Sequence, residues 1–302
     1  MILDDTLAET IALLNNGVSL AEASRMLGIS RSQLSRRLNT LMKRGAVLKY
    51  LNVFIDRLHT PVSVVISEAK QKAQGLRCLI GSPPTVISYY SYAARPVTIS
   101  YVRDDYSGVD AGSIVAGTCR AVFYGRITQV LIPLQEAEAV KPRFRLIDSR
   151  ELVGSPAPLD EADEIIALEL FRVFNPCTIT GNWRLNDLVK IVEGSLGARD
   201  TRHHMVRHVN ALTLRRYVYR GDGVYAVILV ASDTLETLAT LLSQLKESGI
   251  LIDVEQVNMI GSNPFTGLIH AWISPYKLYE PENGHEFTDG ASYSIYPVIS
   301  AK

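Results

Sequence analysis

The stretch SLAEASRMLGISRSQLSRRLNTLMKRG, residues 19–45, contains the starts of two helices separated by a glycine. Ser19 is followed three residues later by Glu22, which is the capping-box pattern of a helix start, and Gly28 ends that segment. Ser30 begins the next segment, whose apolar residues recur at helical spacing: Leu34, Leu38, Leu41 and Met42. Two short helices joined by a tight glycine turn are typical of a helix-turn-helix.

From residue 23 onward, basic side chains follow one another with no acidic residue among them. Between residues 23 and 55 there are seven Lys or Arg residues and no Asp or Glu, although the whole chain has 31 bases and 31 acids. Such a local excess of charge in a neutral protein indicates an anionic partner. Basic amphipathic helices are also common as ordinary solvated helices, but the capped helix starts and the glycine turn favour DNA binding.

The second predicted helix offers side chains suited to duplex DNA. Arg and Gln can form paired hydrogen bonds with guanine and adenine edges, whereas Lys, Ser and a capped helix N-terminus bind phosphates. We expect the base contacts to come from the first half of this helix. The predicted DNA-binding residues of this segment are Ser30, Arg31, Ser32, Gln33, Arg36, Arg37, Lys43 and Arg44. The β-prone residues 46–56 are expected to form a small wing.

The composition indicates a globular protein of about two domains or more, since 47% of its 302 residues are hydrophobic and 21% are charged. The first ten residues, MILDDTLAET, are acidic where a secretory signal is basic, and no apolar run approaches the roughly 20 residues of a membrane span. We therefore expect a cytoplasmic protein without membrane contact. Cys78, Cys119 and Cys177 lie far apart and form no C-x-x-C pair, so neither a disulfide framework nor a zinc knuckle is indicated.

Residues 61–134 alternate β-rich and helical segments. Strands are predicted at 61–67, 85–92, 96–105 and 127–134, and helices at 68–81 and 106–125. This βαββαβ order is the ferredoxin-like split βαβ pattern. Residues 135–163 are rich in charge and proline, which indicates a connecting segment.

The elements predicted after residue 163 repeat those of the first half in the same order. Helices at 165–174, 183–194 and from 198 onward are followed by a hairpin at 214–231, where Asp222 and Gly223 suit a tight turn. A strand, a helix at 233–249, two strands and a late strand at 292–299 complete this copy, which lacks the second sheet-domain helix. Its predicted DNA-binding residues are Arg199, Arg202, His203 and Arg207, with Arg220 at the tip of the wing.

The segment SLAEASRMLGISRSQLSRRLNTLMKRGAVLKY, together with the βαββαβ pattern after it, resembles the Lrp/AsnC (leucine-responsive, feast/famine) transcription regulators. The resemblance covers residues 6–134 and implies a sheet domain that mediates dimerisation and can bind a small-molecule effector. With the degenerate second copy, the predicted fold class is α+β: two winged helix-turn-helix domains and two ferredoxin-like (βαββαβ) α/β sandwich domains, the last one incomplete. The predicted boundaries are 1–58, 59–140, a linker at 141–163, 164–222 and 223–302.

These features predict a transcriptional regulator that binds double-stranded DNA as a pseudo-dimer within one chain, with a further homodimer as an option. Because the two recognition helices differ, the preferred DNA site is expected to be asymmetric. We predict no enzymatic activity and no cofactor. Two alternatives stay open: the domain arrangement also resembles siroheme decarboxylases, enzymes whose sheet domains bind a tetrapyrrole, and a ligand-sensing or assembly module would need no DNA contact.

Two other groups of side chains were weighed for different chemistry. His204 and His208 have the i, i+4 spacing of a helical metal pair, but they lack the glutamate of H-E-x-x-H and an evident third ligand, so no metal site is predicted. The sheet tyrosines are expected to pack in the core or at an interface, with an aromatic effector pocket as the alternative. These tyrosines are Tyr89, Tyr90, Tyr92 and Tyr101.

Overall fold

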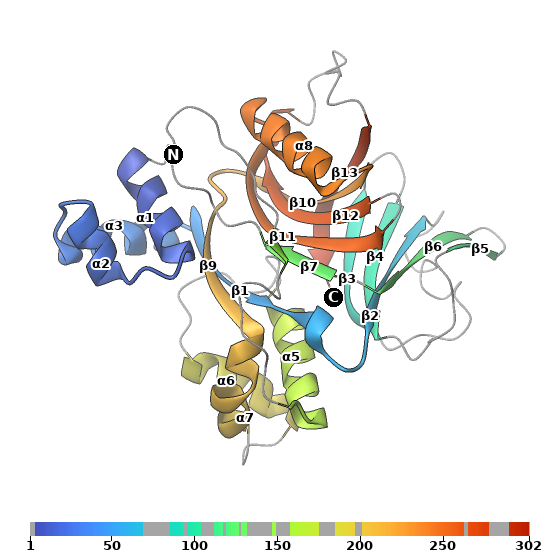
Figure 1. Ribbon diagram of the computed structural model, residues 1–302, viewed down its shortest axis with the longest axis horizontal. Helices are drawn as coiled ribbons and strands as arrows, with labels where there is room; N and C mark the ends of the chain where they lie inside the picture. Colours follow the sequence, from blue (N-terminus) through green and yellow to red (C-terminus); the bar gives the residue numbers. More distant parts are fainter. Residues whose placement is uncertain are drawn as a thin grey trace.

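The computed structural model describes residues 4–68, 85–92, 96–103, 112–116, 119–126, 128–131, 147–148, 158–174, 185–196, 201–262, 265–277 and 290–301. In each half of the chain, a unit of three helices leads into a single strand and then into strands of a large sheet (Figure 1). This arrangement confirms the predicted α+β class. The domain boundaries stay predictions, although the helix that opens the second unit begins at Glu161, inside the predicted linker.

The first helical unit contains α1 (Asp5–Asn15), α2 (Leu20–Met26) and α3 (Arg31–Lys43). Asp4, Ser19 and Ser30 cap the three helices, and each side chain accepts a hydrogen bond from the backbone N–H three residues later. Gly28 has a φ of 65°, the left-handed conformation that turns the chain from α2 into α3. The inner faces of α1 and α3, with the two residues where the following strand begins, form a small separate core made of Leu7, Ile11, Leu38, Leu41, Met42, Ala46 and Val47.

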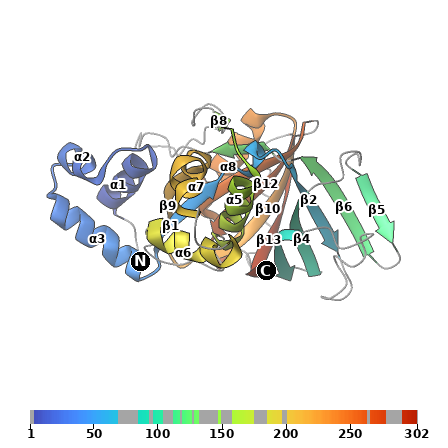
Figure 2. The same ribbon diagram turned by 90° about the horizontal axis from the view of Figure 1, so that it is seen from below.

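The second helical unit contains α5 (Glu161–Val173), α6 (Leu185–Leu196), α7 (Thr201–Arg207) and the short 3-10 helix η2 (Val209–Leu212). Its α5 is buried along most of its length, and Ile166, Leu170 and Phe171 belong to the largest hydrophobic core together with residues of the sheet. Figure 2 shows α1, α2 and α3 at one end of the molecule, whereas α5, α6 and α7 lie beside the sheet. The second helical unit therefore shares the core of the sheet, whereas the first has a separate small core.

The strands that leave the two helical units pair with each other. β1 (Val47–Val53) runs antiparallel to β9 (Thr213–Tyr219) over seven residue pairs, with Tyr50 opposite Arg216 at the centre. The predicted hairpin at 214–231 is therefore wrong, because β9 pairs with β1 and β10 (Val224–Ser232) pairs inside the large sheet. A turn signal such as Asp-Gly marks a reversal of the chain but cannot say which strand each flank will pair with.

Among the described residues, eleven strands form the large sheet, in the order β5-β6-β2-β4-β3-β13-β10-β12-β11-β7-β8. The first half contributes β2 (Val62–Glu68), β3 (Thr85–Tyr92), β4 (Pro96–Arg103), β5 (Gly112–Ala116), β6 (Cys119–Arg126), β7 (Thr128–Leu131) and β8 (Ile147–Asp148). The second half contributes β10, β11 (Leu251–Ser262), β12 (Phe265–Ile273) and β13 (Ala291–Ala301). A 3-10 helix, η1 (Ile55–Arg57), connects β1 to β2.

Two blocks of four strands stand out within this order. In β6-β2-β4-β3 and in β13-β10-β12-β11, the strands follow the same antiparallel arrangement, which is that of a ferredoxin-like sheet. The blocks are joined where β13 pairs with β3 and where β7 pairs with β11. One residue separates β6 from β7. This nearly continuous segment therefore pairs with β2 in the first block and then with β11 in the second block.

One face of the second block is covered by α8 (Leu235–Glu247), whose position agrees with the predicted helix (Figure 1). Leu238, Leu241, Leu242 and Leu245 point from α8 into a second hydrophobic core with residues of β10, β11 and β12. The predicted helix at 68–81 of the first block lies outside the described residues, as does most of the segment between β12 and β13.

The predicted helix at 106–125 is wrong, because β5 and β6 occupy this region as an antiparallel pair. β-branched residues such as Ile114, Val115 and Val122 favour strands, and β6 pairs with β2 on one side and with β5 on the other. The fourth strand of the first block is therefore β6 rather than the predicted segment 127–134, whose β7 pairs with the other block. Across the described part of the chain, no helix is both long and apolar enough to span a membrane.

Candidate nucleic-acid interface

The exposed face of α3 is polar and continuous. Ser32, Ser35, Arg36, Asn39, Thr40 and Lys43 line one shallow hollow on the surface. Leu34 and Leu38 on the opposite face are buried, and this burial fixes which side of the helix meets solvent. The sequence prediction named Ser32, Arg36 and Lys43, and the structure adds Ser35, Asn39 and Thr40 to the same hollow.

The N-terminus of α3 is held by a local hydrogen-bond network. The Ser30 hydroxyl accepts from the Gln33 N–H at 3.3 Å and donates to Gln33 Oε1 at 3.1 Å. Ser32 Oγ lies 3.2 Å from Ser30 Oγ, and Arg31 is exposed beside them. No acidic residue lies in this first turn, so the partial positive charge of the helix N-terminus is not neutralised by α3 itself.

Two neighbouring arginines on α3 have different surroundings. Arg36 lines the hollow, whereas Arg37 forms an ion pair with Asp4, the residue that caps α1. Arg37 was predicted to contact DNA together with Arg36, but its guanidinium joins α3 to the start of α1. Lys43 and Arg44 at the C-terminal end of α3 are both exposed.

The residues predicted to bind DNA in the second copy are dispersed. Arg202, His203 and Arg207 are exposed on α7, while Arg199 lies outside the described residues. Arg220 is not at an exposed wing tip: its Nε donates to the carbonyl of Gly45, and its guanidinium lies 5.2 Å from the ring centroid of Trp272. This correction follows from the pairing of β9 with β1, which turns Arg220 toward the first helical unit and the sheet.

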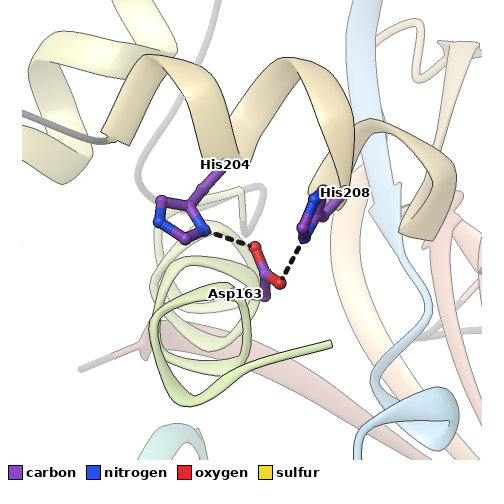
Figure 3. A group of neighbouring side chains, drawn as sticks. All are labelled: Asp163, His204 and His208. Carbon is purple, nitrogen blue, oxygen red and sulfur yellow. Dashed lines mark hydrogen bonds and ion pairs between the residues drawn. The ribbon is translucent and has the colours of Figure 1, made fainter. Parts of the chain in front are cut away.

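A group of three side chains links α7 to the start of α5 (Figure 3). His204 Nδ1 lies 2.9 Å from Asp163 Oδ1, and His208 Nδ1 lies 2.8 Å from Asp163 Oδ2. The Asp163 side chain is fully buried. Burial alone would raise the pKa of Asp163, but hydrogen bonds from the Asp160 N–H and the two imidazoles hold that pKa below its usual value.

Sequence reasoning missed Asp163 because the residue lies 41 positions before His204. Its place at the third position of a capped helix was the available signal, since Asp160 and Asp163 form a capping box at the start of α5. The next residue, Glu164, turns the other way and accepts hydrogen bonds from His59 N–H and from Thr60. The first turn of α5 therefore carries two buried carboxylates with separate partners.

A second polar group lies buried inside the sheet. The hydroxyls of Tyr101 and Tyr225 each lie 2.6 Å from a ring nitrogen of His270. Burial lowers the pKa of His270 to about 3, so the imidazole is neutral at physiological pH. Asn258 Nδ2 donates to Tyr101 Oη, and Gln256 Nε2 donates to Asn258 Oδ1.

The same network reaches the strand that leaves the first helical unit. Tyr50 on β1 donates to Gln256 Oε1 at 3.1 Å. Nearby, Trp272 donates to Glu255, whose pKa is raised to about 8 by burial. The prediction of core packing is confirmed for Tyr89 and Tyr101, which are buried and pack edge to face with ring centroids 6.2 Å apart. The side chain of Tyr92 is not among those that the structure describes.

Comparisons with known proteins agree with the first helical unit. A family model described as the IclR helix-turn-helix domain matches residues 9–49, which span most of α1, all of α2 and α3, and the start of β1. This match identifies a helix-turn-helix DNA-binding domain at the position predicted from sequence. It does not distinguish Lrp/AsnC proteins from other helix-turn-helix families, so that assignment stays a resemblance. No curated protein matches the chain.

Two solved structures resemble the whole chain at low similarity. The crystal structure of the siroheme decarboxylase NirDL has 12% identity and a TM-score of 0.37, covering 98% of this chain and 92% of that chain. The same enzyme in co-complex with an iron-uroporphyrin III analogue has 12% identity and a TM-score of 0.36, covering 92% and 84%. We correct the prediction of no enzymatic activity, which is contradicted because both structures are enzymes. The likeness is too low to assign an activity.

Proposed function

We propose that this protein is a transcriptional regulator whose first helix-turn-helix binds duplex DNA, with α3 as the recognition helix. The observation that carries the proposal is the polar hollow on α3, formed by donors and acceptors of the kinds that read base edges and phosphates. Arg36 and Asn39 have the geometry for paired hydrogen bonds with guanine and adenine, respectively. Lys43 at the far end of the hollow suits a phosphate.

The DNA contact in this proposal depends on the start of α3. Ser30 caps the helix, and the uncompensated partial charge of the N-terminus attracts a phosphate. A helix-turn-helix places the N-terminal part of its second helix against the base edges, which brings Arg31 and Ser32 toward the major groove. The residues we expect to contact DNA in the first unit are therefore Ser30, Arg31, Ser32, Gln33, Arg36, Lys43 and Arg44.

The proposal includes a pseudo-dimer within the chain. In the β1–β9 ribbon, Val47 pairs with Tyr219 and Val53 pairs with Thr213, so the two helical units enter the ribbon at opposite ends. Seven antiparallel residues span roughly 20 Å at about 3.4 Å per residue. Because α3 and α7 differ in length and surface, the two half-sites would differ, and we expect an asymmetric DNA site. The Lrp/AsnC resemblance, the effector and further homodimerisation belong to this proposal.

The test is binding of the full chain to genomic DNA fragments, measured by fluorescence anisotropy across a salt series. Wild-type affinity should fall with a log–log slope of about 0.9 per phosphate neutralised. The double variant Arg36→Ala/Lys43→Ala should bind at least about tenfold more weakly and with a slope smaller by about 1. Arg172→Ala is a control for loss of positive charge, because Arg172 pairs with Glu169 on α5 in the other unit.

Absence of binding by the wild type at low salt would contradict the proposal, as would equal losses in the double variant and in Arg172→Ala. An absorption spectrum of the purified protein distinguishes the enzyme alternative. A bound tetrapyrrole gives strong visible bands, whereas a regulator without such a group is colourless. A coloured protein that binds no DNA would overturn the assignment as a regulator.

A further inference from the structure

Asp163 of α5, His204 of α7 and His208, the residue after α7, bring three metal-binding atoms together. All of these atoms lie within 4.8 Å of one another. His204 and His208 are four residues apart, and the His208 N–H donates to the His204 carbonyl, so both rings leave the same side of one helical turn. Figure 3 shows the two imidazoles on either side of the Asp163 carboxylate.

The surroundings of Asp163 favour an added positive charge. Its carboxylate is fully buried, and its hydrogen-bond partners among the described residues are the two imidazoles and the Asp160 N–H. A buried carboxylate is costly unless it is paired with a cation or binds a metal. A second carboxylate also lies close, because Asp160 Oδ1 is 3.7 Å from His204 Nδ1.

The three donors match one class of ion. Two imidazoles and a carboxylate suit Zn²⁺ and neighbouring divalent transition metals better than Mg²⁺ or Ca²⁺, which prefer oxygen ligands. Zinc binds imidazole nitrogen at about 2.0–2.1 Å and carboxylate oxygen at about 2.0–2.2 Å. Two ligands of one ion are therefore separated by about 4 Å or less, so small side-chain movements would close the present arrangement around a metal.

We propose that Asp163, His204 and His208 bind one divalent transition-metal ion, with Zn²⁺ as the best match. The metal takes the place of the two His–Asp hydrogen bonds: the proton that each neutral ring donates from Nδ1 to the carboxylate moves to Nε2 by exchange with solvent, and Nδ1 then coordinates the ion. The carboxylate supplies the third ligand, and water takes the fourth position. The ion fastens the seven-residue α7 to α5, independently of whether the first unit binds DNA.

The test uses the full chain, stripped of metal with a chelator and then titrated with ZnCl₂ by isothermal titration calorimetry. We expect about one Zn²⁺ per chain and a rise of the melting temperature by about 5 °C when free Zn²⁺ exceeds the Kd a hundredfold. His204→Gln and His208→Gln should each weaken binding by at least about tenfold. Glutamine can still hydrogen-bond to Asp163, which favours retention of the fold.

His203→Gln is the matched control. Its ring centroid lies 6.1 Å from that of His204 and 6.2 Å from that of His208, yet His203 is exposed and outside the ligand group. It should bind Zn²⁺ as the wild type does. No Zn²⁺ uptake by the wild type would overturn the proposal, and so would uptake that both glutamine variants retain.

A second measurement does not depend on the variants folding. X-ray absorption of the Zn²⁺-loaded wild type should show a shell of nitrogen and oxygen ligands with two imidazoles. A shell containing sulfur, or one without imidazole, would place the metal elsewhere and contradict the proposal.

Discussion

The two helical units have the same order of elements but different relations to the rest of the molecule. In the first unit, α1 and α3 form a small separate core with the start of β1, and Tyr217 and Tyr219 of β9 pack against it. Two hydrogen bonds between Asn15 and Tyr217 and one from Arg220 to Gly45 attach the unit to the β9 end. In the second unit, α5 is part of the largest core, where Phe171 packs against Tyr101 of the sheet. The first copy stands outside the main core, and the second is built into it.

The third helix of each unit reflects this difference. α3 has 13 residues and an exposed polar face, while α7 has seven, and its His204, together with His208 just after it, turns inward to Asp163. A surface that binds DNA must stay exposed, whereas a helix that stabilises a core must bury its side chains. The comparison teaches that, of two units with the same order of elements, one can keep an exposed face while the other becomes part of the scaffold.

The largest expected effect comes from emptying each core in turn. Phe171→Ala should lower the free energy of unfolding of the whole protein by about 3–5 kcal/mol, because it leaves a cavity where the second unit meets the sheet. Leu38→Ala should cost about 2–5 kcal/mol, but mainly in the first unit. Urea unfolding would measure the first effect, and hydrogen exchange of the α1–α3 amides would measure the second.

These two variants test directly whether each helical unit unfolds with the large core or separately from it. If Leu38→Ala lowered the protection of amides in α5 and β4 as much as that of amides in α3, the first unit would not be an independent core. If Phe171→Ala lowered protection in α5, α6 and α7 alone, the second unit would not be part of the large core.

A smaller effect concerns acid stability of the large core. His270 has a pKa of about 3 in the folded protein against an ordinary value of 6.5. Below pH 6.5, this imidazole therefore binds a proton in the unfolded chain but stays neutral in the folded one. As the pH falls below 6.5, His270 therefore lowers the free energy of unfolding by about 1.4 kcal/mol per pH unit, which amounts to about 2 kcal/mol at pH 5. Glu255, with a pKa near 8, acts in the opposite direction between pH 4.5 and 8, because its folded form keeps the proton.

Replacing His270 should change how the free energy of unfolding depends on pH. His270→Gln removes the acid-labile group, so its free energy of unfolding should rise relative to that of the wild type by about 2 kcal/mol as the pH falls from 7 to 5. Urea unfolding of both proteins at the two pH values measures the difference, and other acids cancel because both chains contain them. Equal pH dependence in the two proteins would contradict burial of a neutral His270.

DNA binding gives the next expected effect and tests which unit meets the DNA. Arg36→Ala should weaken binding by about tenfold, which corresponds to about 1.4 kcal/mol, because Arg36 lines the α3 hollow. Arg202→Ala, which removes an exposed arginine from α7, should weaken binding by less than about twofold. Anisotropy titrations at one salt concentration compare them. A larger loss for Arg202 would reverse the roles assigned to the two units.

Local features of the fold could be predicted from sequence. The caps at Ser19 and Ser30, the turn at Gly28 and the apolar stripe of α3 act within a few residues of one another, so the pattern contains the information that sets the structure. The helix α8 and the strand β13 were predicted for the same reason. The prediction of a helix-turn-helix needed no distant contact.

Features that depend on distant partners could not be predicted. The partner of β9 is β1, which lies more than 160 residues earlier in the chain. Because of this pairing, Arg220 contacts Gly45 and Trp272 instead of lying at the expected wing tip. The ligand group at Asp163 and the His270 network likewise join residues from separate elements. Sequence patterns identify the histidines, but only the packing of helices and strands decides what faces them.

The smallest expected effect separates the two adjacent arginines of α3. Arg37 pairs with Asp4 at a site where its side chain is 41% exposed, and exposed ion pairs contribute only about 0–1 kcal/mol. Arg37→Ala should therefore change the stability of the first unit by at most about 0.5 kcal/mol and weaken DNA binding less than Arg36→Ala does. Hydrogen exchange and anisotropy measure the two quantities, and Arg37→Lys keeps the charge as a control. If Arg37→Ala weakened DNA binding as much as Arg36→Ala, the guanidinium would have to leave Asp4 for the DNA, and the contact face of α3 would extend toward α1.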